Sequence, residues 1–254
     1  SKYDYLFYLD SDVVMENIDT LKILFQDLLL DKSFGSIGPV CSYRNLNNAI
    51  TSNFVAAKTC YGFDQDNKLI EFSGMRSECG LIEKQFLKLV GGWNFFPSAG
   101  GEEFELGHRI TEHGKKNIIT KNTNYSTFYD SLYVRCKTIV SRASSYLPIF
   151  VSRKKFESKG AFATLNQSLS TFITALLLLI IILSIFLNDL NFFILVLFIA
   201  NLLIEFDFLR FSMKYYKKTY LLINILGIFL INISIIIGIL FGIYKLKFFL
   251  KKIN

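Results

Sequence analysis

The sequence predicts an α/β domain followed by membrane-spanning helices, and three observations support this fold class. An apolar run, YLFYL at 5–9, is followed by a helical pattern and then by a second apolar run. Two stretches, 169–187 and 221–243, contain no charged residue over 19 and 23 positions. The first 168 residues hold 20 of the 28 Lys and Arg residues and 18 of the 21 Asp and Glu residues. Charged and strongly apolar parts of the chain are therefore separate.

The first apolar run is predicted to be a strand, because it is apolar on both of its faces, as in a mostly parallel sheet. Asp19 is placed to cap a helix over 20–31, and 35–40 is typical of the next strand. That helix is expected to bury one stripe of apolar residues, which consists of Leu21, Leu24, Phe25, Leu28 and Leu29.

The region 53–83 alternates short β-like runs with turn residues, and the clearest of these runs are 53–63 and 68–72. A helix is then predicted over 83–90, ending at Gly91-Gly92. Another is predicted over 102–113, ending at Gly114. The chain begins inside a strand and lacks an initial Met, so we expect the first βαβ portion of the sheet, and much of a nucleotide site, to precede this sequence.

Two acidic residues, Asp10 and Asp12, follow the first strand directly. Ligands of open α/β sheets bind beyond the carboxyl ends of strands. Residues two apart in an extended chain point the same way, so both carboxylates can face one ligand. Such a pair repels unless a cation lies beside it, which favours a hard divalent ion, Mg²⁺ or Mn²⁺, shared with phosphate oxygens. The alternative to a metal site is that one of the two aspartates caps a turn and the other is simply solvated.

A second acidic group opens the predicted helix at 102–113. Glu102 and Glu103 are favoured there by the helix dipole. Glu103 lies on the inward stripe of the helix, where a carboxylate facing a cleft suits a general base. Its alternative is a plain helix-start acid. Glu105 is predicted to form an ordinary surface ion pair with Arg109.

The two histidines and the tryptophan are also candidates for contacts with a ligand. His108 and His113 lie off the inward stripe and are expected to be exposed. Trp93, the only tryptophan, follows Gly91-Gly92 in a loop. It is predicted either to form the wall of a sugar site or to anchor the loop.

The C-terminal part is predicted to cross the membrane, because 169–187 and 221–243 are each long enough to span a hydrocarbon core of about 30 Å. A middle segment, 192–209, either spans or lies along the surface. The loop at 210–218 and the tail at 245–252 each carry four basic residues, and two or three spans would place one or the other in the cytoplasm. The positive-inside rule therefore leaves both numbers of spans open. The formal net charge of +7 comes mainly from 169–254, which favours a membrane-surface partner over nucleic acid.

The cysteines Cys41, Cys60, Cys79 and Cys136 lie far apart in the sequence. Their spacing matches neither a zinc site nor a disulfide framework. Free thiols in a reducing compartment are expected.

Three motifs occur in a fixed order, and together they resemble those of the membrane-attached family 2 glycosyltransferases of GT-A fold. Asp10-Ser11-Asp12 matches that family's D-x-D after an apolar strand. Gly91-Gly92-Trp93-Asn94 matches a G-G-(aromatic)-(Asp/Asn) turn, and EEFEL with Arg109 matches a later E-D-x-(D/E)-L helix start. Order and spacing agree over roughly residues 3–120.

The resemblance implies a Rossmann-like nucleotide-diphospho-sugar transferase domain, here without its first part, that transfers a sugar with inversion. Asp12 would hold a divalent metal, and Asp10 would contact the ribose or the metal shell. Glu103 falls where the family usually has an Asp base, and Glu102 matches the Glu before it. The sequence departs from the pattern in having Glu for Asp at 103 and Phe95 where an acid is usual.

The segment 145–156 resembles the Arg-bearing, Tyr-rich stretch that precedes the first span in several such enzymes. Arg153 is the candidate for a diphosphate or lipid-phosphate contact, since arginine binds phosphate well. Its alternative is a contact with anionic headgroups at the membrane surface. The predicted organisation is a partial transferase domain at 1–130, an amphipathic membrane-proximal segment at 131–168, and a transmembrane region at 169–254.

The predicted function is therefore that of a multi-pass membrane glycosyltransferase with a cytoplasmic catalytic domain. Its partners would be a nucleotide-diphosphate sugar donor, a glycan or lipid-linked acceptor, and the bilayer. Two alternatives stay open, namely transfer to polyprenyl phosphate and a non-catalytic membrane scaffold derived from a transferase.

Overall fold

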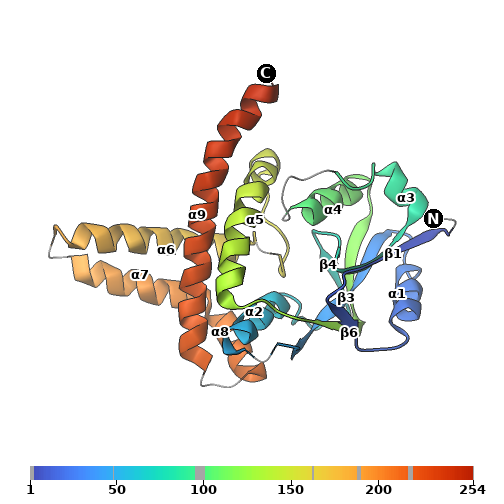
Figure 1. The fold of residues 1–254 in the computed structure, drawn as a ribbon, viewed down its shortest axis with the longest axis horizontal. Helices are drawn as coiled ribbons and strands as arrows, with labels where there is room; N and C mark the ends of the chain where they lie inside the picture. Colours follow the sequence, from blue (N-terminus) through green and yellow to red (C-terminus); the bar gives the residue numbers. More distant parts are fainter. Residues whose placement is uncertain are drawn as a thin grey trace. The chain divides into compact units, whose positions relative to one another are not determined.

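We describe a computed structural model of the chain over residues 3–47, 49–94, 101–161, 163–187, 190–216 and 220–253, with the backbone alone for 245–253 (Figure 1). The chain forms two compact units, each of which is described by itself. The first unit comprises Ser1–Tyr129 and Glu157–Ala161, and the second comprises Asp130–Phe156 and Phe162–Asn254.

The first unit is a mixed α/β structure built on a six-stranded sheet. Its strands are β1 (Tyr5–Leu9), β2 (Val13–Met15), β3 (Phe34–Asn45), β4 (Leu69–Phe72), β5 (Cys79–Glu83) and β6 (Lys116–Thr127). Its helices are α1 (Thr20–Leu28), α2 (Ile50–Tyr61), α3 (Lys84–Leu89) and α4 (Glu102–Glu112).

The sheet has the strand order β1-β5-β3-β6-β2, and β4 also pairs with β6. Only the β3–β6 pair is parallel among the described strands, so the prediction of a mostly parallel sheet is wrong. Strand β1 lies at one end of this order and is half-buried rather than fully covered. Its continuous apolar sequence therefore reflects contacts on both faces without complete burial.

Both faces of the sheet pack against helices, because side chains alternate along each strand. On one face, Leu24 and Leu28 of α1 contact Leu81 of β5. On the other face, Ile82 of β5 contacts a cluster from α3 and α4 that includes Leu106. These contacts place the unit in a layered α/β class.

Helix α1 confirms a helix that begins after Asp19, but it ends at Leu28 rather than at 31, and the Asp19 side chain makes no capping hydrogen bond. The predicted buried stripe is confirmed only in part. Leu24 and Leu28 are buried, whereas Leu21 and Leu29 are about half exposed. Phe25 lies at the surface against the edge of the Tyr5 ring, with ring centroids 5.0 Å apart. The helix presents a narrower face to the sheet than the apolar pattern indicates.

Residues 53–61 belong to helix α2, so the predicted β-like run at 53–63 is wrong. Phe54, Val55, Ala56, Ala57 and Cys60 are all buried, and a helix covered on several sides has no clean 3.6-residue pattern to distinguish it from a strand. The predicted strand at 68–72 is confirmed as β4. Predicted helix ends at Gly91-Gly92 and Gly114 are also confirmed.

A short segment, Glu157–Ala161, returns to the first unit after the chain has entered the second. The Ser158 hydroxyl lies 2.9 Å from the Ser73 hydroxyl, and the Ser158 N–H donates to it at 3.1 Å. A Cβ atom at Gly62 would lie only 1.9 Å from Gly160 Cα, so this close approach requires glycine. The first unit is thus completed by residues distant in sequence.

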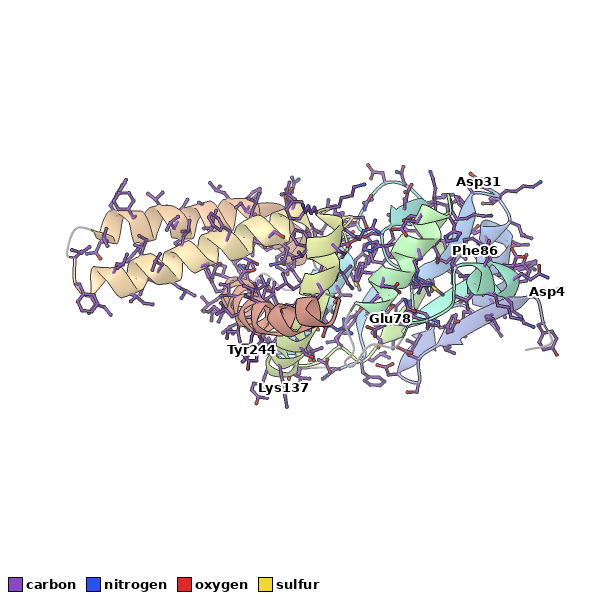
Figure 2. All side chains as sticks on the ribbon, turned by 90° about the horizontal axis from the view of Figure 1, so that it is seen from above. Asp4, Asp31, Glu78, Phe86, Lys137 and Tyr244 are labelled. Atoms are coloured by element: carbon purple, nitrogen blue, oxygen red, sulfur yellow. The ribbon has the colours of Figure 1, made fainter. Side chains whose placement is uncertain are left out.

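The second unit consists of the helices α5 (Leu132–Arg153), α6 (Leu165–Ser184), α7 (Asn191–Ile204), α8 (Phe206–Tyr215) and α9 (Leu221–Ile253). Figure 2 shows the many carbon-only side chains that project from the paired α6 and α7. Leu165–Ser184 and Leu221–Tyr244 are each long and apolar enough to cross a membrane. The pair α7 and α8 is bent by 57° and is the candidate for a third crossing.

Candidate functional site

The two aspartates lie in the turn that connects β1 to β2, and both are exposed. The Asp10 N–H donates to the Glu78 carbonyl at 2.8 Å, and the Val13 N–H donates to the Asp10 carbonyl at 3.2 Å. The Thr127 hydroxyl lies 3.4 Å from Asp12 Oδ2. Backbone bonds on both sides of Asp10 therefore hold this turn while both carboxylates face solvent.

The pKa of the Asp10 carboxyl lies above its ordinary value. Partial burial is the largest cause, followed by the negative charge of Glu78 and then by that of Asp12. Glu78 immediately precedes β5, whose Cys79 pairs with Leu9. The prediction from sequence missed Glu78, because only strand pairing brings it to the end of β1.

A buried guanidinium, that of Arg76, lies beside Glu78. Its Nη1 atom is 3.6 Å from Glu78 Oε2, and its carbon Cζ lies 4.8 Å from the centroid of the Phe63 ring. Its Nε and Nη2 atoms have no hydrogen-bond partner within the described part of the chain. Arg76 thus partly balances the negative charge around Asp10 and was also missed from sequence.

A divalent cation is compatible with Asp10 and Asp12, although the structure does not test its presence. Among the described residues, no group of three or more His, Cys, Asp or Glu side chains is arranged to hold a metal ion. Mg²⁺ is commonly bound through one or two carboxylates, with substrate phosphates and water completing its shell. Two exposed, mutually repelling carboxylates fit that kind of incomplete site.

The N-terminus of α4 carries Glu102 and Glu103, both of which are half-buried. Glu103 Oε2 accepts a hydrogen bond from the Gly101 N–H at 3.3 Å, so its side chain bends back toward the helix start. The next inward residues, Leu106 and Ile110, are fully buried. Glu103 therefore lies at the border between core and surface, and its role as a base stays a prediction.

Residues 75–78 connect the two acidic positions through backbone hydrogen bonds. The Met75 N–H donates to the Glu103 carbonyl at 2.9 Å, and the Glu78 carbonyl accepts from Asp10 at 2.8 Å. Because these four residues of chain span at most about 14 Å, the two bonds cannot lie further apart than that. The end of β1 and the start of α4 are therefore joined through this short segment.

The Gly-Gly turn is attached to α4 by Arg109. The predicted Glu105–Arg109 ion pair is confirmed, with Arg109 Nε and Nη2 each 2.7 Å from a Glu105 oxygen. Arg109 also donates to the carbonyls of Val90 and Gly92. The pair is thus more than a surface contact, because it fixes the turn that leads to Trp93.

Two side chains of that turn reach neighbouring elements. Asn94 Nδ2 donates to Glu105 Oε1 at 2.7 Å. Trp93 packs edge-on against Tyr8 of β1, with ring centroids 5.7 Å apart. Trp93 therefore anchors the loop close to the end of β1, and its predicted sugar contact stays a prediction. Phe95 lies outside the described residues.

The expectation that His108 is exposed is wrong, whereas His113 is exposed as predicted. His108 is buried, and its Nε2 atom lies 3.0 Å from a carboxylate oxygen of Glu157, which is also buried. Its Nδ1 atom has no hydrogen-bond partner among the described residues. Glu157 follows 49 residues later in the sequence, so no local pattern could indicate the pair.

Arg153 lies in the last turn of α5, in the second unit, and is partly exposed. Its predicted phosphate contact is not tested by the structure. Comparison with models of known protein families finds no match to this chain, and comparison with curated proteins finds no significant relative.

Proposed function

We propose that this chain is part of a membrane-attached, metal-dependent glycosyltransferase. It would move a sugar, with inversion, from a nucleotide-diphosphate donor to a glycan or lipid-linked acceptor at the cytoplasmic membrane face. The observation that carries the proposal is the short bridge at 75–78, which is hydrogen-bonded to Asp10 at one end and to Glu103 at the other. Metal-binding and base candidates thus belong to one region of the first unit.

Each side chain has a distinct part in this proposal. Asp12 would hold the cation, and Asp10 would contact the ribose or the cation shell. When bound, Mg²⁺ or Mn²⁺ would supply Lewis-acid stabilisation of the departing diphosphate. Glu103 would remove the acceptor proton, Glu102 and Trp93 would contact substrate, and Arg153 would bind a phosphate.

The first test is sugar transfer by the protein at its natural length, with nucleotide-diphosphate sugars as donors and Mn²⁺ present. Asp12→Ala should lower kcat/KM by at least about 100-fold, since electrostatic stabilisation of a leaving group is worth several kcal/mol. Asp66→Ala is the matched control, because Asp66 is exposed and lies in the segment between α2 and β4. Full activity in Asp12→Ala would disprove the assignment.

The second test separates two acceptor classes. Glu103→Gln should lower transfer to a hydroxyl acceptor by about 100-fold or more, which is typical of a lost general base, and Glu103→Asp should retain most activity. A polyprenyl phosphate acceptor is already ionised and needs no base. That alternative gains some support from the hydrogen bond between Glu103 and Gly101, which occupies one carboxylate oxygen. Unchanged activity in Glu103→Gln, together with inactive Asp12→Ala, would favour it.

A further inference from the structure

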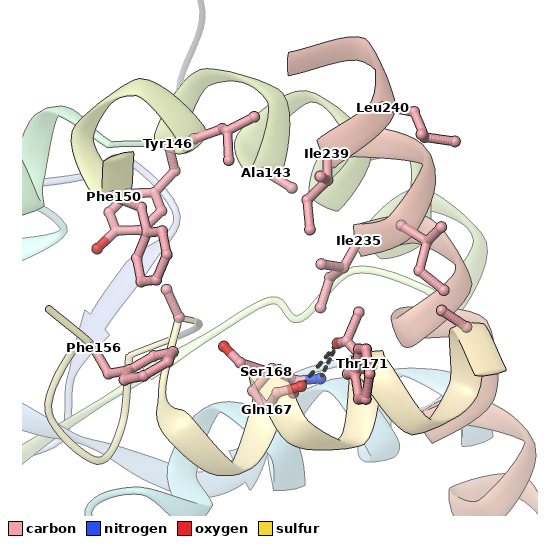
Figure 3. Close-up of a pocket in the computed structure, with 15 residues that line it drawn as sticks. Ala143, Tyr146, Phe150, Phe156, Gln167, Ser168, Thr171, Ile235, Ile239 and Leu240 are labelled. Carbon is pink, nitrogen blue, oxygen red and sulfur yellow. Dashed lines mark hydrogen bonds between the residues drawn. The ribbon is translucent and has the colours of Figure 1, made fainter. Parts of the chain in front are cut away.

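A partly open cavity of about 470 Å³ lies within the second unit, lined mainly by α5, α6 and α9 (Figure 3). Pockets that hold small ligands commonly measure about 300–1,000 Å³, so it is large enough for part of a molecule. Its wall is mainly carbon and includes Tyr146, Phe150, Phe172, Ile235, Ile239 and Leu240.

The amide and threonine groups in this wall bond to other protein atoms. Gln167 Nε2 donates to Asn232 Oδ1 at 2.6 Å, and the Thr171 hydroxyl lies 3.2 Å from the same oxygen. Both residues are buried. A wall with few available polar groups holds water poorly and favours a hydrocarbon ligand.

A basic turn lies at the α5 end of the cavity. Phe150 and Phe156 both line it, and their ring centroids are 5.4 Å apart. Between them lie Arg153, Lys154 and Lys155, and the two lysines are exposed. The Lys154 N–H donates to the Phe150 carbonyl at 2.8 Å. Helix α5 ends at the preceding residue, and the backbone of Lys154 is in the left-handed conformation. Because this turn brings Phe156 back to the cavity, three positive charges lie beside the apolar wall.

We propose that the cavity binds the apolar chain of a lipid whose phosphate headgroup lies at Arg153-Lys154-Lys155. Helices α6 and α9, which supply two of its walls, are both long and apolar enough to cross a membrane, and in a bilayer lipid would surround the pocket. Burying each CH₂ group contributes about 0.8 kcal/mol, and cationic side chains select an anionic headgroup. This inference shares Arg153 with the proposed function but goes beyond it, because lipid binding in the cavity does not require sugar transfer.

The test uses the full chain in phosphatidylcholine nanodiscs and lipids that carry a diazirine in the chain. The probes are a prenyl monophosphate, a diacyl phosphatidic acid and the uncharged prenol. After irradiation, mass spectrometry should locate the label on α6 near Ala175 and on α9 near Ile239. A prenyl phosphate preference would identify a single-chain lipid phosphate as the source, and a phosphatidic acid preference would identify bilayer phospholipid.

Filling variants test whether the label reports the cavity. Ala175→Phe or Ser168→Phe should reduce labelling by more than about tenfold, because excluding a few CH₂ groups removes more than 1.4 kcal/mol. Ala200→Phe on α7 is the matched control, since Ala200 does not line the cavity. Lys154→Gln with Lys155→Gln should reduce labelling by the phosphates but not by prenol. Asp12→Ala should leave labelling unchanged even though transfer is lost.

Two results would overturn the proposal. One is equal labelling of the cavity by prenol and by both phosphates, which would remove any role for the basic turn. The other is labelling that persists in both filling variants, which would place the lipid elsewhere on the helices.

Discussion

The two units bury different kinds of polar group. In the α/β unit, charged types are buried beside neutral ones, namely Asp27, His108 with Glu157, and the guanidinium of Arg76. Between the apolar helices α6, α7 and α9, the buried polar side chains are neutral amides and hydroxyls. Glu205, at the bend between α7 and α8, is the one buried acid among the described residues of the second unit.

This difference is the one expected if the apolar helices of the second unit lie in a bilayer and the α/β unit lies in water. A charge costs several kcal/mol at the centre of a bilayer, whereas neutral groups can share hydrogen bonds between helices. Asn232 does so, bonding to Gln167 and Thr171 and donating to Ser170 and Thr174 at 2.8 and 2.9 Å. Arg76, in contrast, lies among rings with two nitrogens unpartnered among the described residues.

The largest effect is expected from breaking the His108–Glu157 pair. Glu157→Leu should destabilise the first unit by about 3 kcal/mol, because removing one partner leaves a buried polar ring without compensation. Fluorescence of Trp93, the only tryptophan, reports thermal unfolding of this unit in the full chain. Glu157→Gln keeps a hydrogen-bonding oxygen and should cost clearly less. Equal stability of Glu157→Leu and wild type would show that the pair contributes nothing.

A smaller loss is expected in the second unit from Asn232→Leu. It removes four hydrogen bonds, and such bonds average about 0.6 kcal/mol in membranes, so about 2 kcal/mol should be lost. Unfolding by sodium dodecyl sulfate, followed by circular dichroism, measures the change. Ser234→Ala is the control, since its hydroxyl donates within α9 to the Leu230 carbonyl at 2.8 Å. A loss in Asn232→Leu no greater than in the control would contradict the network's role.

Arg76→Met should change stability by about 1 kcal/mol or less. Replacing a buried charge with an apolar side chain of similar length is often neutral, because the charge had to be desolvated. Glu78 is 43% exposed and can be solvated without Arg76. The same Trp93 fluorescence assay applies. A loss above about 3 kcal/mol would show that the aromatic rings stabilise the cation as strongly as a paired carboxylate.

The smallest effect concerns Asp10, whose pKa is raised in the folded state by burial, Glu78 and Asp12. Ionisation of such a carboxyl disfavours folding, so Asp10→Asn should stabilise the chain at neutral pH by less than about 1 kcal/mol after solvent screening. The gain should be absent below the ordinary Asp pKa, grow as pH rises through the folded-state pKa, and then stay constant. Mn²⁺ should raise the Tm of wild type more than that of Asp10→Asn. A gain in stability that increased as the pH fell would contradict this explanation.

The sequence predicts the bounds of a helix best where acidic residues open the helix and a glycine follows its end. Helix α4 was predicted almost to its ends, because acids open it and Gly114 follows it. Helix α2 was missed because its buried apolar residues carry no period. Long-range partners were missed for another reason. Glu78 reaches Asp10 through strand pairing, and Glu157 reaches His108 through a returning segment, so neither proximity is encoded locally.

The returning segment also affects how the protein is made. Because the α/β unit includes Glu157–Ala161, it cannot be completed during translation until α5 has been synthesised. Leu165, the first residue of a candidate span, follows only four residues after Ala161. The residues that complete the α/β unit and the candidate span α6 are therefore synthesised directly after one another. A chain stalled before residue 157 would carry an open α/β unit.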